Sequence, residues 1–211
     1  MTIRAVLFDL HGVLTSSPWS ALAEVAASPG VDEALALRVI LGDYATDGDH
    51  PWHRLERGEI TVEEYFRLVV AEAEAAGVAL DWSRMSGYGE RMAINHQVPD
   101  RIGRLRAEGY KTALVTNNVR EMAGGWRALF DVDALFDIVV DSSSVGMRKP
   151  NPAIFLHTLD ALGGIAPAEA VFLDDSEGNV AGARAAGLHA ILVEDVDAAL
   201  ADLDRLLSGA G

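Results

Sequence analysis

Residues 170–193 read AVFLDDSEGNVAGARAAGLHAILV, in which two short apolar runs enclose a segment with helical periodicity. The runs are Ala170–Leu173 and Ala190–Val193, and the helical pattern covers Asn179–Ala186. Each run has the length of a fully buried strand and is bounded by polar residues or glycine. A strand, a helix and a second strand in this order are typical of a parallel sheet.

The same pattern occurs in other parts of the chain. Three further apolar runs of strand length are Ile3–Phe8, Lys111–Val115 and Asp137–Val140, and helical patterns cover Pro152–Leu162 and Ala198–Leu207. Strands that are apolar on both faces and alternate with helices predict a parallel sheet covered on both sides. We therefore predict the α/β fold class, with a Rossmann-like parallel sheet sandwiched by helices.

The segment between residues 16 and 97 has a different pattern and contains no convincing strand. It contains helical stretches instead, such as Asp32–Leu41 and Thr61–Ala76. An all-helical insertion after the first strand is the simplest interpretation. We assign residues 1–14 and 97–211 to the α/β core domain and residues 15–96 to a helical cap domain.

The composition excludes several classes of function. The chain has 211 residues, a formal net charge of −15 and no cysteine. The charge argues against nucleic acid and anionic membrane surfaces as partners. The absence of cysteine excludes disulfide scaffolds, zinc–thiolate sites, iron–sulfur clusters and cysteine nucleophiles. The N-terminus has no signal-peptide pattern, and no apolar stretch approaches the ~18 residues of a membrane helix, so we expect a soluble, cytoplasmic protein.

Polar side chains follow the predicted strands, where ligands bind to open parallel sheets. Any one of these carboxylates could simply cap the next turn or helix, and a lysine there could be a solvated surface charge. Two adjacent carboxylates, however, repel each other unless a cation joins them. Oxygen ligands without a His or Cys cluster suit Mg²⁺. The residues that together predict a site are Asp9, Thr116, Asn117, Lys149, Asp174 and Asp175.

These residues lie in four ordered motifs that resemble those of the haloacid dehalogenase-like (HAD) hydrolase superfamily. The nearest resemblance is to the subgroup that contains the N-terminal phosphatase domain of soluble epoxide hydrolase, and the cap stretch HRLERGEIT at 53–61 is similar to that subgroup. The resemblance covers nearly the whole chain and implies a HAD-like core with a cap that selects the substrate. The motifs are FDLHGVL at 8–14, VTNN at 115–118, GMRKPNP at 146–152 and FLDDSEGN at 172–179.

The resemblance implies catalytic and metal-binding roles for the acidic residues. Asp9 would be the nucleophile that attacks phosphorus and forms an aspartyl-phosphate. Mg²⁺ would lie between the Asp9 carboxylate, the backbone carbonyl of His11 and the Asp175 carboxylate, with Asp174 close by.

The resemblance also implies how the phosphate is held. Thr116 and the Asn117 amide would bind phosphate oxygens, and Lys149 would balance the charges of the nucleophile and the phosphate. Gly12 would let the loop turn tightly against the phosphate. These roles fit phosphoryl transfer, which depends mainly on positioning and charge neutralisation.

His11 departs from the family pattern, because phosphatases of this family carry an Asp at that position. That Asp protonates the leaving group and later accepts a proton from water. We consider three interpretations: His11 is itself the acid–base, the enzyme is a slowed phosphatase, or the chain has a noncatalytic role.

We therefore expect a Mg²⁺-dependent phosphatase of a small phosphorylated metabolite, with a sugar phosphate as the default substrate. One alternative is a phosphate-binding or regulatory module with weakened catalysis. A second is a metal-independent 2-haloacid dehalogenase, against which the paired Asp174 and Asp175 argue. Candidates for the mouth of the pocket, each of which could instead serve cap packing, are Trp19, Tyr44, His50, Trp52 and His53.

Overall fold

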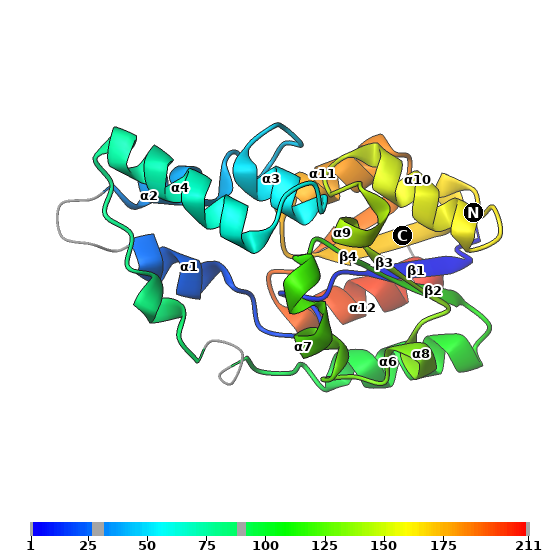
Figure 1. Cartoon of the computed structure of the whole chain (residues 1–211). Helices are drawn as coiled ribbons and strands as arrows, with labels where there is room; N and C mark the ends of the chain where they lie inside the picture. Colours follow the sequence, from blue (N-terminus) through cyan, green and yellow to red (C-terminus); the bar gives the residue numbers. More distant parts are fainter. Residues whose placement is uncertain (1, 27–31, 88–91, 210–211) are drawn as a thin grey trace.

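The computed structural model describes residues 2–26, 32–87 and 92–209. Its centre is a five-stranded parallel sheet with the strand order β3-β2-β1-β4-β5 (Figure 1). The Rossmann-like α/β fold predicted from the sequence is confirmed. The strands are β1 (Ala5–Phe8), β2 (Lys111–Thr116), β3 (Ile138–Asp141), β4 (Ala170–Asp174) and β5 (His189–Leu192).

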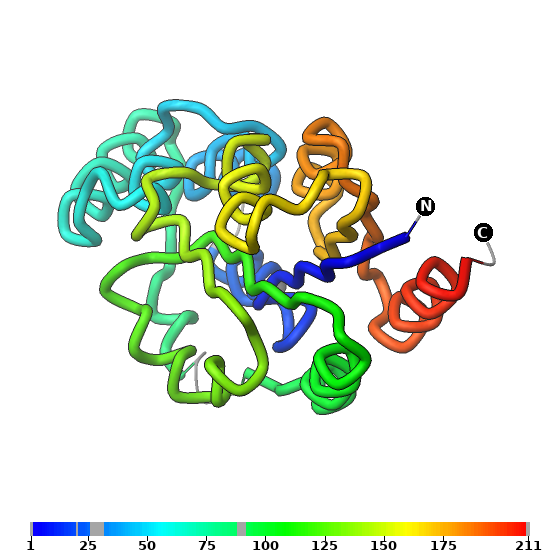
Figure 2. The backbone as a smooth tube through the Cα atoms, turned by 90° about the vertical axis from the view of Figure 1, so that its right-hand side faces the viewer, coloured from blue at the N-terminus to red at the C-terminus, as the bar shows by residue number. Residues whose placement is uncertain are grey.

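Helices cover both faces of the sheet, because each strand alternates apolar side chains between two separate clusters. On one face, Phe8 packs with Ile102 and Leu203. On the other face, the rings of Phe155 and Phe172 lie 5.1 Å apart between their centroids. Figures 1 and 2 show the two helical layers on opposite sides of the strands. The first layer contains α6 (Gln97–Ala107), α8 (Val132–Leu135) and α12 (Val196–Leu207), and the second contains α10 (Pro152–Ala161) and α11 (Glu177–Ala185).

The strand ends differ from the predicted ones by a residue or two. β2, β3 and β4 each extend to a polar residue, Thr116, Asp141 and Asp174 respectively. The register explains this, because Thr116 pairs with Asp141 and Asp174 pairs with Leu192. The backbone ladder therefore continues one residue past the apolar run and holds these polar side chains in fixed positions.

The described residues between 16 and 97 form helices that share one apolar cluster, which includes Ile40, Leu55 and Val69. The Thr61 hydroxyl caps the longest of these helices, because it accepts a hydrogen bond from the Glu64 amide at 3.2 Å. We propose that this cluster is the core of a separate cap domain. The helices are α1 (Trp19–Ala26), α2 (Glu33–Leu41), α3 (Pro51–Glu56), α4 (Val62–Ala76) and the 3₁₀ helix η1 (Trp82–Met85).

The two chain segments that join these helices to the sheet lie side by side. The Ser16 amide donates to the Ala93 carbonyl at 2.8 Å, and the Asn95 amide donates to the Leu14 carbonyl at 2.9 Å. The helices α1–α4 are thereby held beyond the carboxyl ends of the strands (Figure 1). This is the edge of the sheet at which a ligand site is expected.

Short helices occupy the remaining connections of the sheet. Two of them, η2 and α7, follow β2, and Glu121 of η2 accepts a hydrogen bond from the Val62 amide at the start of α4 at 3.2 Å. Of all the helices in the described parts of the chain, none has the length and apolar character that crossing a membrane requires. The short helices are η2 (Arg120–Met122), α7 (Ala123–Arg127), α9 (Ser142–Val145) and η3 (Pro167–Glu169).

Candidate functional site

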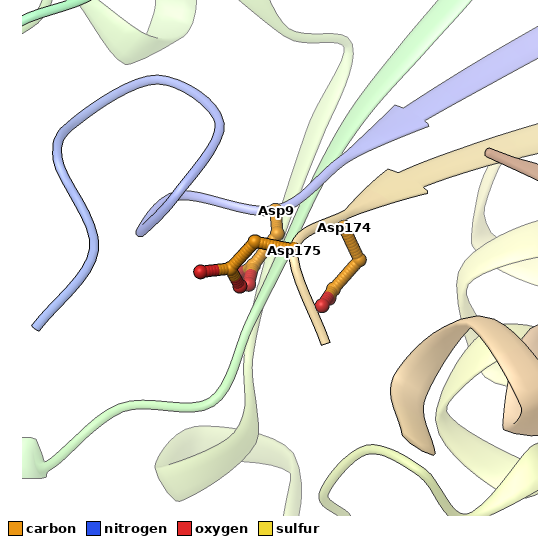
Figure 3. A group of neighbouring side chains, drawn as sticks. All are labelled: Asp9, Asp174 and Asp175. Carbon is orange, nitrogen blue, oxygen red and sulfur yellow. The ribbon is translucent and has the colours of Figure 1, made fainter. Parts of the chain in front are cut away.

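Three carboxylates meet where β1 and β4 end (Figure 3). Asp9 directly follows β1, Asp174 is the last residue of β4, and Asp175 comes next. Each offers one oxygen, and these oxygens lie within 4.8 Å of one another. The cluster forms because β1 and β4 are parallel neighbours, and the Asp9 amide continues their ladder by donating to the Leu173 carbonyl at 2.9 Å.

Lys149 supplies the positive charge of the site. Its Nζ lies 2.6 Å from Asp9 Oδ1 and 2.7 Å from Asp174 Oδ2, and its side chain is completely buried. Burial opposes the charged ammonium group, but the attraction of Asp174 and Asp9 outweighs it and raises the pKa of Lys149. The lysine is therefore a fixed cation that touches the expected nucleophile.

Asp174 serves mainly to hold Lys149 in place. Its Oδ1 accepts hydrogen bonds from the Ser176 amide at 2.8 Å and from Asn179 Nδ2 at 3.0 Å. Its Oδ2 accepts from Asn179 Nδ2 at 3.1 Å as well as from Lys149. Both oxygens are thus occupied by protein donors. Asn179 lies inside the fourth sequence motif, although no role was predicted for it.

The arrangement of Asp9 and Asp175 fits a divalent cation. The Leu10 amide and Lys149 both contact Asp9 Oδ1, so these contacts leave Oδ2 unoccupied. Burial raises the pKa of Asp9 and of Asp175, and mutual repulsion within the acidic cluster adds to the effect. Three carboxylates facing one lysine leave excess negative charge, which a hard, oxygen-loving cation such as Mg²⁺ would neutralise.

Gly12 gives the loop after β1 room to approach Asp175. Its φ is +79°, and a Cβ at this position would lie 2.1 Å from Asp175 Oδ2. Any side chain here would collide with the carboxylate and strain the backbone.

His11 points its Nδ1 at the hydroxyl of Thr15, 3.1 Å away. The Thr15 hydroxyl has one proton and faces the carbonyls of Leu10 and Ser16, at 3.4 and 3.3 Å. This favours Nδ1–H as the donor to Thr15 and leaves Nε2 as a proton acceptor. Burial and the nearby Lys149 lower the pKa of His11 to about 4. The geometry suits acceptance of a proton better than its donation.

The two polar residues at the end of β2 are placed differently from each other. Thr116 is completely buried, and its hydroxyl is 3.4 Å from the Asn117 carbonyl. The Asn117 side chain binds the backbone of Lys149 twice: Oδ1 accepts from the Lys149 amide at 2.8 Å, and Nδ2 donates to its carbonyl at 3.0 Å. The side chain of Asn117 therefore fixes the loop that carries Lys149.

A second buried charge pair lies beside the first, where the cap helices meet the sheet. Arg148 Nε donates to Glu56 Oε2 at 2.7 Å, and the Arg148 guanidinium also donates to the Thr46 carbonyl at 2.6 Å. Tyr44 Oη contacts Glu56 Oε1 at 3.3 Å, and Asn117 Nδ2 contacts Glu56 Oε2 at 3.4 Å. No role was predicted from the sequence for Arg148 or Glu56, although both lie in stretches that carry the family resemblance, Arg148 in GMRKPNP at 146–152 and Glu56 in HRLERGEIT at 53–61.

A cavity of about 280 Å³ opens on the acidic cluster and extends among the cap helices. Of the five cap residues named from the sequence, Trp19, Tyr44 and Trp52 line it. The other two have structural contacts instead. His50 Nδ1 accepts from the Trp52 amide at the start of α3, and His53 Nδ1 accepts from the Gly48 amide.

Comparison with known proteins finds relatives over nearly the whole chain. A family model described as haloacid dehalogenase-like hydrolase matches residues 3–187. The chain is 34% identical to acyl-CoA dehydrogenase family member 10 of Mus musculus, over 97% of this chain but 19% of that protein. It is 32% identical to bifunctional epoxide hydrolase 2 of Mus musculus, over 98% of this chain and 39% of that protein. The chain thus spans well under half the length of both relatives.

Two further matches cover nearly the full length of both chains. Phosphatase MT3486 of Mycobacterium tuberculosis is 29% identical over 100% of each chain. The crystal structure of the HAD family enzyme bt-2542 of Bacteroides thetaiotaomicron, in complex with magnesium and inorganic phosphate, is 24% identical with a TM-score of 0.62, covering 92% of this chain and 96% of that one. Because the family model spans most of the chain and the four motifs meet at one site, this chain belongs to the haloacid dehalogenase-like hydrolases.

Proposed function

We propose that the chain is a Mg²⁺-dependent phosphomonoesterase that forms an aspartyl-phosphate on Asp9. The observation that carries the proposal is the contact between Lys149 Nζ and Asp9 Oδ1 at 2.6 Å inside a buried acidic cluster. A cation in contact with the nucleophile lets the Asp9 carboxylate approach a negatively charged phosphoryl group.

The reaction takes two displacements at phosphorus. In the first, an Asp9 oxygen bonds to phosphorus while the bond from phosphorus to the ester oxygen breaks, and the alcohol leaves with a proton from the site or from water. In the second, water attacks the same phosphorus, which releases inorganic phosphate and restores the Asp9 carboxylate. His11 Nε2, an acceptor in the observed geometry, would take the proton of that water.

The metal would be held by Asp9, Asp175 and the backbone carbonyl of His11, with Asp174 close by. When bound, Mg²⁺ supplies neutralisation of the phosphate charge. We assign the phosphate oxygens to Thr116, the Asn117 backbone amide and Lys149. Gly12 leaves room for the phosphate in the loop after β1.

The full-length phosphatase relative supports the phosphate reaction over dehalogenation. The site itself adds a second argument, because Asp174 and Asp175 place negative charge where a metal-independent reaction has no use for it.

Phosphate release from acetyl phosphate and 4-nitrophenyl phosphate, with and without Mg²⁺, tests the proposal. The wild type should turn over both substrates only with Mg²⁺, and Asp9→Asn should abolish turnover. Asp141→Asn is the matched control, because Asp141 also ends a strand but caps α9 by accepting from the Ser143 amide at 3.0 Å. Phosphate binding without turnover by the wild type would instead support the regulatory module.

A further inference from the structure

The cavity beside Asp9 has two chemically different ends. Its inner end is polar and is formed by residues of the sheet edge, which include Asp9, Asp175 and Asn179. Its other end lies among the cap helices and is almost entirely apolar. A ligand that fills the whole cavity must therefore carry its charge at one end only.

Five separate helices build the apolar end. Aromatic rings pack against one another in its walls: the Trp19 and Tyr44 rings meet edge to face at 4.8 Å between their centroids, and the Phe66 and Trp82 rings do so at 5.1 Å. Such surfaces favour aliphatic or aromatic groups. The apolar end includes Trp19, Leu22, Leu41, Leu55, Phe66 and Met85.

The hydroxyl groups near this apolar end already have protein partners. Tyr65 Oη donates to the Ile40 carbonyl at 2.8 Å, and Tyr44 Oη contacts Glu56. A sugar bound here would lose hydrogen bonds to water without gaining replacements, which is unfavourable for each buried hydroxyl group. The cavity therefore does not suit the sugar phosphate expected by default from the sequence.

The cavity also reaches the surface beside apolar side chains. Of its lining residues, Phe66 is 38% exposed and Met122 is 57% exposed. They are two of the four exposed large hydrophobic residues in the described parts of the chain. Exposed apolar side chains at a binding cavity are typical of sites for apolar ligands.

We propose that the substrate is a phosphate monoester of an apolar, largely aliphatic alcohol, whose chain lies among the cap helices. The proposal rests on the phosphatase function proposed above and names its substrate class. The volume of about 280 Å³ is close to the lower end of the usual range for small-molecule sites, about 300–1,000 Å³.

A series of n-alkyl phosphates from two to twelve carbons tests the proposal, with acetyl phosphate and glucose 6-phosphate as comparisons. Each methylene buried in the cavity should raise kcat/KM about fourfold. The increase should level off at the chain length that fills the cavity, and longer chains should gain nothing further. Glucose 6-phosphate should be a poorer substrate than octyl phosphate. Equal kcat/KM along the series, or a preference for the sugar phosphate, would overturn the proposal.

Substitutions at two positions of helix α4 test where the alkyl chain of the substrate lies. Val62 lines the cavity at the start of α4, whereas Val70 is 45% exposed on the same helix and does not line it. Val62→Trp should shift the preferred chain length to fewer carbons. Val70→Trp should leave both the chain-length preference and acetyl phosphate turnover as they are in the wild type. An unchanged chain-length profile in both variants would contradict the placement.

Binding of n-alkyl phosphonates separates this proposal from the proposed function. Phosphonates are not hydrolysed, and their binding can be followed by the fluorescence of the cavity tryptophans in the presence of Mg²⁺. The Kd should fall about fourfold per methylene whether or not the protein turns over acetyl phosphate. If the Kd for phosphonates falls with chain length but the protein does not hydrolyse acetyl phosphate, only the phosphatase function is refuted. If the Kd for phosphonates does not change with chain length, the apolar substrate class is refuted.

Discussion

Arg148 Nε lies 2.7 Å from Glu56 Oε2, with both side chains almost completely buried between cap helix α3 and the loop that carries Lys149. Burial raises the pKa of Glu56, and the neighbouring Arg148 partly offsets this. A buried charge without its partner is much less stable than the intact pair. This pair therefore ties cap helix α3 to the loop that carries Lys149.

We expect Glu56→Gln to lower the free energy of unfolding by about 3 kcal/mol, because the Arg148 charge would remain buried without a carboxylate. Urea denaturation measures the change. Arg4→Met is the control, since the Arg4–Glu169 pair is exposed, with 58% and 35% of the two side chains accessible. An exposed pair contributes about 0–1 kcal/mol. Equal losses in the two variants would contradict the role of the buried pair.

Asp174 and Asp175 should respond differently to removal of their charge. Asp174 is occupied by Lys149, Ser176 and Asn179, so we expect Asp174→Asn to weaken Mg²⁺ binding only indirectly, by about tenfold. Asp175→Asn removes a proposed metal ligand. It should therefore weaken Mg²⁺ binding by much more than the loss of about 10–100-fold that is typical when a residue behind the metal ligands is replaced. Calorimetric titration with Mg²⁺ compares the two variants. Weaker binding by Asp174→Asn than by Asp175→Asn would reverse the assignment.

His53 should make stability depend on pH. It is 1% exposed, and its Nδ1 accepts from the Gly48 amide at 3.0 Å, so the neutral ring fits its surroundings and a protonated ring does not. Burial, followed by the nearby Arg148, lowers the pKa of His53 to about 4. The unfolded chain therefore binds this proton first, and stability is lost as the pH falls from about 6.5 towards 4.

The loss attributable to His53 should approach about 3 kcal/mol. Urea denaturation of the wild type and of His53→Gln at several pH values isolates this contribution, because all other titrating groups are common to both proteins. The difference between the two free energies of unfolding should shrink as the pH falls. A difference that is constant between pH 7 and pH 4 would contradict the prediction.

The sequence predicted the fold and the acidic cluster for the same physical reason. Buried parallel strands must be apolar over their whole length, so the first polar residue after each run marks the sheet edge. Asp9, Lys149, Asp174 and Asp175 could be placed together because neighbouring parallel strands end at one edge. Their meeting in the structure agrees with that expectation.

The cavity and the Arg148–Glu56 pair could not be predicted in this way. The two paired residues are 92 positions apart, and no local pattern links an arginine to one particular glutamate at that separation. The cavity is enclosed by side chains from several cap helices. Each of these side chains has the periodicity of ordinary helix packing, so only the packing of the helices against one another shows which of them leave space for a ligand.

The replacement of an Asp by His11 leads to the last prediction. If the missing carboxylate is the only defect of the site, His11→Asp should raise turnover of alkyl phosphates by roughly tenfold to a thousandfold, because a positioned acid protonates a poor leaving group. The gain on aryl phosphates should be smaller at the first step, since phenolates leave without full protonation. Steady-state phosphate release measures both gains.

If hydrolysis of the aspartyl-phosphate limits the rate, the wild type should accumulate an acid-stable, hydroxylamine-sensitive phosphoenzyme. Asp9→Asn should remove this phosphoenzyme both in the wild type and in His11→Asp. If His11→Asp lowers turnover and His11→Ala lowers it further, His11 is itself the working acid–base and the interpretation as a slowed enzyme is wrong.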